Sequence, residues 1–122
     1  TGAKAQVHIS YYDSVHKRLR HIGQSGGTFA APRDLDSTGT VGSHNAIAAS
    51  ADGDVWVAYY DFTNQYLKLI RRTGGSWGKP ETIDSAGHVG RHVSAALGPG
   101  GALHISHWNV TAKALRYTRV CP

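Results

Sequence analysis

A 48-residue repeat constrains this 122-residue chain more than any other feature of its sequence. Residues 7–13 read VHISYYD, and the segment returns as VWVAYYD at 55–61 and as LHISHWN at 103–109. Residues 7–54 align with residues 55–102 without a gap and with 17 identities. A repeat of this period indicates that one structural unit is duplicated and stacked along the chain.

Each unit is predicted to contain four short antiparallel strands. In the complete unit we expect them at 45–50, 55–60, 66–71 and 77–83. The pairs Asp52-Gly53 and Gly74-Gly75 suit tight hairpin turns, and the second strand is dense in β-branched and aromatic residues. Because no segment carries a helical period, the sequence predicts an all-β chain built from β-propeller blades.

The repeat divides the chain into about two and a half blades of a single partial β-propeller. Residues 1–44 hold the second, third and fourth strands of one blade, residues 45–92 a complete blade, and residues 93–122 the first three strands of another. A propeller needs roughly 4–8 blades to close. We therefore expect other chains or further blades to complete the ring, and we do not expect the isolated chain to be a compact monomer.

The repeat resembles tandem repeats of bacterial and archaeal proteins that are assigned to sialidase-like or lectin-like β-propellers. The resemblance is carried by HISYYD at 8–13, by Val-Gly at 41–42 and 89–90, and by Leu67-Lys68. The glycine turns at 25–29 and 73–77 resemble the Asp-boxes of sialidase-type propellers, although they lack the aspartate. The resemblance implies a propeller fold, which hosts lectins, hydrolases, lyases and scaffolds alike.

Charge and composition narrow the choice of partner. The net charge is +5 with a pI near 9.6, which favours anionic partners such as acidic glycans. The cations form no long run, so nucleic acid is not expected, and no apolar segment is long enough to span a membrane. One cysteine, Cys121, excludes an internal disulfide. The cellular compartment stays open, with an extracellular location preferred.

We place a ligand site at the end of the blades where the longer polar loops emerge, because binding residues are usually carried by such loops. The opposite end consists of glycine hairpins, to which we assign turn geometry alone. We expect two copies of the site. One consists of Arg91, His92, Tyr60 and Asp61, and the other of Ser43, His44, Tyr12 and Asp13. Trp108 is the aromatic equivalent of the two tyrosines in the third unit. Arg91 replaces Ser43 within matching Val-Gly-x-His loops and supplies a two-pronged donor for an anion.

Several of these repeated residues also have a purely structural interpretation. The histidines can be buried between blades, the tyrosines can be core residues, and Asp13, Asp61 and Asn109 can cap the turn that follows the second strand. A repeated cation in the third strand is expected to lie along the blade surface, at Arg20, Lys68 and Arg116. No cofactor is expected, and no metal, because the histidines form no compact cluster on one element.

The favoured function is a lectin-like module that binds carbohydrate without chemistry of its own. One alternative is a fragment of a propeller glycoside hydrolase or polysaccharide lyase that acts on acidic glycans, and another is a structural or protein-interaction scaffold. Catalysis is the less favoured alternative, because Glu81 is the only glutamate and the aspartates are mostly repeated turn residues. A hydrolase of the common kind needs two carboxyl groups that face one bond.

Overall fold

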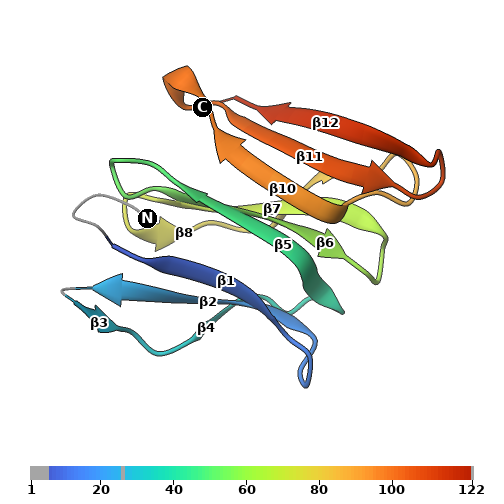
Figure 1. Ribbon diagram of the computed structural model, residues 1–122. Helices are drawn as coiled ribbons and strands as arrows, with labels where there is room; N and C mark the ends of the chain where they lie inside the picture. Colours follow the sequence, from blue (N-terminus) through green and yellow to red (C-terminus); the bar gives the residue numbers. More distant parts are fainter. Residues whose placement is uncertain (1–5, 26, 122) are drawn as a thin grey trace.

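The computed structural model describes residues 6–25 and 27–121 as an all-β protein with three antiparallel sheets (Figure 1). The first sheet contains β1 (His8–Asp13), β2 (Arg18–Ser25), β3 (Thr28–Phe29) and β4 (Arg33–Asp36). The second contains β5 (Val41–Ala49), β6 (Val55–Asp61), β7 (Tyr66–Thr73), β8 (Ser76–Trp77) and β9 (Glu81–Asp84). The third contains β10 (Arg91–Leu97), β11 (Leu103–Asn109) and β12 (Ala114–Val120).

Helical structure within the described ranges is limited to a 3-10 turn at Pro99–Gly101, and none of it is long and apolar enough to cross a membrane. The expectation of an all-β chain of antiparallel strands is therefore confirmed. The strands form three sheets that follow one another along the chain.

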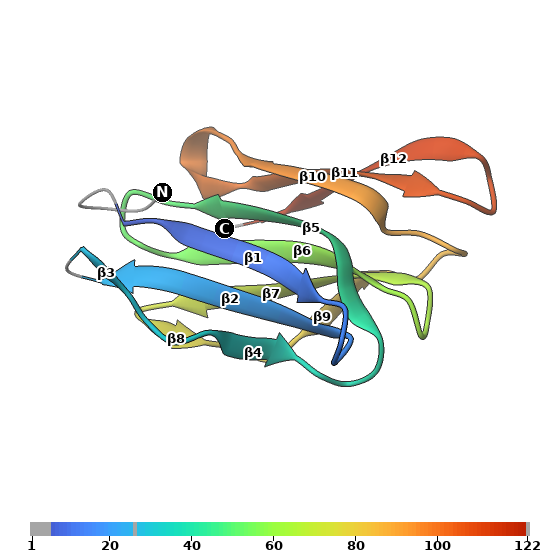
Figure 2. The same cartoon turned by 60° about the horizontal axis from the view of Figure 1, so that its bottom comes forward.

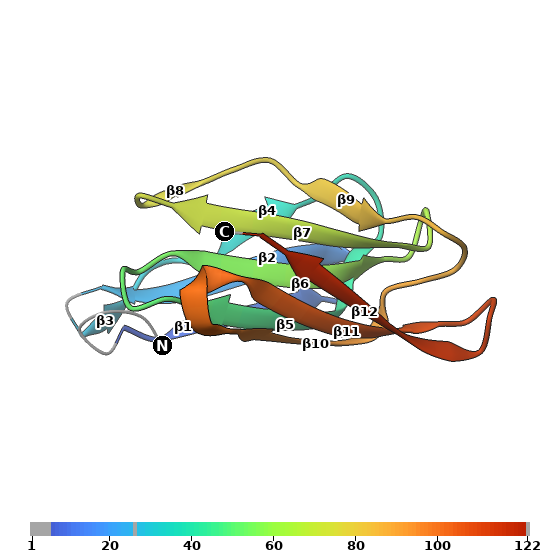
Figure 3. The same cartoon turned by 90° about the horizontal axis from the view of Figure 1, so that it is seen from above.

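The sheets are stacked in chain order, with the second sheet between the other two (Figure 1). Strands β1, β5 and β10 lie along one edge of the stack, and β4, β8 and β9 lie along the opposite edge (Figures 2 and 3). Strand β5 contacts both β1 and β10. We call the edge formed by β1, β5 and β10 the inner edge.

The second sheet buries both of its faces, and β6 shows why its sequence is apolar throughout. Successive side chains of a strand point to opposite faces. Val57 and Tyr59 lie in a core cluster with Leu19 of the first sheet, whereas Ala58 lies in a cluster with Leu103 of the third. Each of these five side chains is at most 1% exposed, so β6 anchors two separate cores.

The first strand of the second sheet begins earlier than predicted, at Val41 instead of residue 45. Val41 pairs with Asp61, and pairing resumes only at Asn45, so the intervening residues form a bulge. Gly42 has a φ of 103°, and a Cβ on it would lie 2.7 Å from the Cα of Leu19. Residues 41–44, predicted to precede the strand, therefore belong to it, because a glycine bulge lets the strand continue. Strand β10 begins at Arg91 with the same irregularity.

The fourth strand of a unit is not one strand but two short ones, which raises the ten strands expected to twelve in the described ranges. The break between β8 and β9 contains Pro80, and the break between β3 and β4 contains Pro32. Proline has no N–H to donate to a neighbouring strand. The prediction of a continuous strand over 77–83 was therefore wrong, although both pieces pair with β7.

A buried carboxylate joins each sheet to the next. Asp36, at the end of β4, accepts a hydrogen bond from Tyr59 Oη at 2.5 Å and lies 3.1 Å from Lys68 Nζ. One repeat later, Asp84 Oδ2 lies 2.9 Å from His107 Nε2 and accepts from Arg116 Nε at 2.7 Å. The repeat therefore conserves a polar link between sheets as well as their strands.

These links correct the expectation that the cations of the third strand lie along the surface. Lys68 and Arg116 pair with aspartates of the preceding sheet, and Arg20 pairs with Asp34 at 2.9 Å. Burial alone would raise the pKa of Asp36, but hydrogen bonds from Thr38, Tyr59 and Lys68 hold it below its ordinary value. Lys68 and Arg116 therefore neutralise carboxylates at the sheet interfaces, whereas Arg20 pairs within its own sheet with an aspartate that is 37% exposed.

Candidate functional site

The structure brings several of the predicted site residues together at the inner edge. The rings of His44 and His92 are 4.6 Å apart between centroids, and His44 lies 6.0 Å from the ring of Tyr60. The guanidinium carbon of Arg91 lies 5.6 Å from the centroid of Tyr60. Both histidines have positive φ, 54° and 52°, and both are exposed. The alternative that His44 and His92 are buried between sheets is therefore wrong.

Tyr60 is buried beneath this inner-edge cluster, with 1% of its surface exposed. Its hydroxyl group shares a hydrogen bond of 2.5 Å with Nε2 of His88, whose ring is stacked on it at 5.7 Å. His88 was not predicted as a site residue. The sequence does carry a signal for it, because the two units differ at this position, with Thr40 in the first and His88 in the second. Because His88 and Arg91 cover the ring, Tyr60 holds the cluster together and does not present a free face.

The two aspartates of the predicted site are occupied by their own turns. Asp13 Oδ1 accepts from Val15 N at 3.0 Å, and Asp61 Oδ1 accepts from Asn64 N at 3.1 Å. Asn109 accepts in the same way from Ala112 N at 3.0 Å. The interpretation of these residues as turn caps is confirmed.

The remaining predicted residues lie on the strands of the inner edge or on the strand next to it. Ser43 and Tyr12 are half-buried on β5 and β1. Trp108 is 38% exposed on β11, where it pairs in register with Arg91. Within the ranges that the structure describes, no group of three or more histidine, cysteine or acidic side chains is placed to hold a metal ion.

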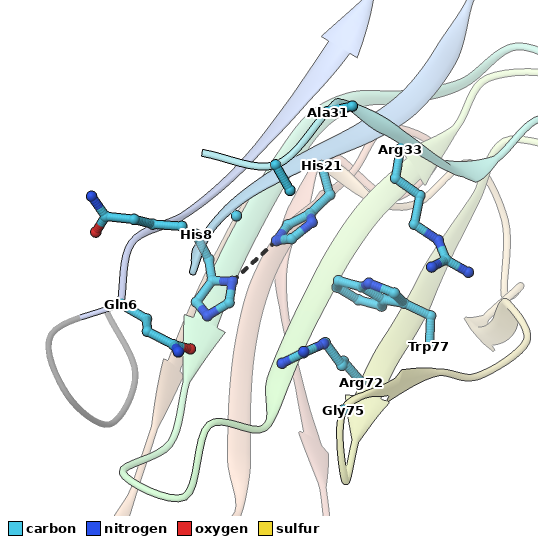
Figure 4. A pocket seen from close by; sticks show the side chains of 11 residues that line it. Gln6, His8, His21, Ala31, Arg33, Arg72, Gly75 and Trp77 are labelled. Carbon is cyan, nitrogen blue, oxygen red and sulfur yellow. Dashed lines mark hydrogen bonds between the residues drawn. The ribbon is translucent and has the colours of Figure 1, made fainter. Parts of the chain in front are cut away.

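A second candidate site lies at the opposite end, the one with the glycine hairpins. A cavity of about 300 Å³ opens there between the first and second sheets (Figure 4). Its polar and aromatic lining comes from Gln6, His8, His21, Arg33, Arg72 and Trp77. Sequence reasoning missed this cavity, because the glycine hairpins were assigned turn geometry alone.

Two imidazoles and one indole form the wall of the cavity. Nδ1 of His8, on β1, lies 3.1 Å from Nε2 of His21, on β2, and the two rings are stacked. The edge of the His21 ring meets Trp77 of β8 at 4.9 Å between centroids. Arg72 pairs in register with Trp77, and its Nη1 donates to the carbonyl oxygen of Gly53 at 3.3 Å.

The cavity carries positive charge that the surrounding protein does not neutralise. Burial, aided by the charges of His8, Arg72 and Arg33, lowers the pKa of His21 to about 4, and burial with the charge of Arg72 lowers the pKa of His8. Both imidazoles are therefore neutral at pH 7, while the guanidinium groups stay charged. Neither Arg33 nor Arg72 forms an ion pair with any residue in the described part of the chain.

The first-unit residues that line the cavity differ from the residues at the equivalent positions of the second unit. The second-unit equivalents of His8 and His21 are Trp56 and Leu69, and both pack in the apolar cluster between the second and third sheets. The same two positions hold a histidine pair and an open space at the first interface. A signal was therefore present in the sequence, at two positions that are titratable in the first unit and apolar in the second.

No protein-family model matches this chain, and no curated protein matches it either. Its function is inferred below from the chemistry of its own residues.

Proposed function

We propose that this chain is part of a carbohydrate-binding β-propeller, and that a sugar occupies the cavity between the first and second sheets. The observation that carries the proposal is an indole beside a group of hydrogen-bonding side chains in one recess. A sugar ring offers an apolar C–H face to an aromatic ring and hydroxyl groups to polar side chains. Ligand pockets usually combine apolar walls with a few placed polar groups.

The exposed faces of the outer sheets support the propeller. Leu115 and Tyr117 of the third sheet are 72% and 62% exposed. Their equivalents in the second unit, Leu67 and Leu69, are fully buried against the third sheet. Exposed apolar patches of this kind usually mark an interaction surface. Further blades of the same repeat, from the same protein or from other chains, would cover them as the third sheet covers the second.

The lining of the cavity favours binding over hydrolysis. Among the described residues that line it, none is acidic. A glycoside hydrolase of the common kind uses two carboxyl groups on either side of the scissile bond. The cavity therefore suits a lectin-like role, in which hydrogen bonds and stacking hold the sugar unchanged.

A glycan array tests the proposal and its location together. We expect the unmodified chain to bind a defined set of glycans. His21→Leu should abolish this binding, and Arg91→Ala at the inner edge should leave it unchanged. His21→Leu introduces the residue that the second unit carries at the same position, so the variant should fold. Binding of no glycan at all would refute the proposed function. A loss with Arg91→Ala alone would move the site to the inner-edge cluster that the sequence predicts.

A further inference from the structure

We propose that the sugar held in the cavity carries a carboxylate group, as uronic and sialic acids do. This inference rests on the proposed function and narrows it to acidic sugars.

The guanidinium groups provide the charge. Arg33 stands at the start of β4 and Arg72 on β7, and Figure 4 shows their side chains flanking Trp77. Both side chains line the same recess. Planar guanidinium groups bind carboxylates through paired, charge-assisted hydrogen bonds. With no ion pair to any described residue, both arginines are available to an anionic ligand.

His8 adds a nitrogen that needs a partner. Its Nε2 atom is buried and has no hydrogen-bond partner among the described residues. Its Nδ1 atom is shared with His21 Nε2 at 3.1 Å. When His21 donates in this bond, the neutral His8 ring carries its proton on Nε2. A buried N–H without an acceptor is unfavourable, and a ligand carboxylate in the cavity would supply the acceptor.

The comparison between units shows that this charge is specific to one interface. At the interface between the second and third sheets, the positions equivalent to Arg33 and Arg72 hold Glu81, of the second unit, and Val120, of the third. A structural repeat has no need for two cations at one interface and for an acid and an apolar residue at the next. Arg33 and Arg72 both line the cavity.

The test uses matched pairs of sugars that differ only in the carboxylate. Methyl glycosides of glucuronic, galacturonic and mannuronic acid are titrated into the chain beside those of glucose, galactose and mannose, with N-acetylneuraminic acid as a further acid. Binding is followed by NMR. We expect at least one acid to bind roughly ten- to a hundred-fold more tightly than its neutral counterpart, the effect of one charged hydrogen bond.

Three variants locate the charge. Arg72→Gln and Arg33→Gln should each remove most of the preference for the acid while leaving the neutral sugar weakly bound. Arg71→Gln is the control, because Arg71 adjoins Arg72 on β7 but does not line the cavity and instead lies 3.7 Å from Glu81. It should leave the preference unchanged.

Each outcome decides the inference. Acid preference that Arg72→Gln or Arg33→Gln abolishes supports it. Equal binding of acids and neutral sugars overturns it and leaves the proposed function standing. Preference that survives both cavity variants overturns it as well, and binding of none of the sugars overturns both proposals.

Discussion

Replacing Asp36 by asparagine should strongly destabilise the protein, because it removes a buried charge that joins two sheets. The side chain of Asp36 is fully buried, and it meets both Tyr59 Oη and Lys68 Nζ of the second sheet. Removal of one partner from a buried charged pair costs about 3–5 kcal/mol, mainly because the other charge is left uncompensated. If the free energy of unfolding falls by about 2 kcal/mol for each 1 M of urea, the urea concentration at the unfolding midpoint should drop by roughly 1.5–2.5 M.

Asp34→Asn is the matched control, two residues away on the same strand. Asp34 pairs with Arg18 and Arg20, both at 2.9 Å, but its side chain is 37% exposed. Ion pairs of this kind contribute at most about 1 kcal/mol. The variants are compared by urea unfolding at pH 7 and one protein concentration, followed by fluorescence and circular dichroism. Equal losses for the two variants would refute the reasoning from burial.

A second substitution separates charge from packing. In the Asp36→Asn background, Lys68→Met removes the uncompensated cation and should restore part of the lost stability. The coupling between the two positions should exceed about 1 kcal/mol, as for residues within one buried network. Strictly additive losses would mean that Asp36 acts through the shape of its turn and not through its charge.

Three further comparisons test the packing of the sheets and the burial of His21. Gly42→Ala should cost several kcal/mol in urea unfolding because its Cβ would meet the backbone of β2, whereas Gly53→Ala, with no atom within 4 Å, should cost only about 1–2 kcal/mol for its positive φ. His21 is buried with its pKa lowered to about 4, so its protonation favours the unfolded chain, and stability should fall as the pH drops from 6.5 towards 4. His21→Leu should reduce this loss of stability, measured as the difference between the urea midpoints at pH 7 and pH 5. An unchanged difference would show that protonation of His21 does not cause the loss. Leu69 is buried, so Leu69→Ala should lower the free energy of unfolding by about 2–5 kcal/mol. Its equivalent Tyr117 is exposed, so Tyr117→Ala should lower it by under about 0.5 kcal/mol in the chain alone. Equal losses would mean that another surface covers the third sheet.

The repeat predicted the strands and their grouping well, because each unit carries its own hydrophobic pattern and turns. Where a boundary was wrong, a local backbone feature had overridden the pattern. Gly42 continues β5 through a bulge, and Pro80 interrupts the fourth strand. Neither effect changes the order of hydrophobic residues, so periodicity alone could not reveal it.

The candidate site was harder to predict, because repeated identity does not distinguish function from structure. Asp61 recurs because its turn needs a cap, and Lys68 recurs as a cation because Asp36 needs a partner. The cavity instead lies where the first two units differ, at His8 and His21. Whether these substitutions open a space depends on the packing of two sheets, which a single sequence does not show.

The most direct test of a sugar site in the cavity is a map of the chain's own NMR signals during titration with an acidic glycan. The account predicts that the indole N–H of Trp77 and the ring signals of His8 and His21 shift in proportion to the bound fraction. Signals of His44 and His92 at the inner edge should stay in place. Shifts confined to the inner-edge histidines, with those of the cavity unmoved, would contradict it.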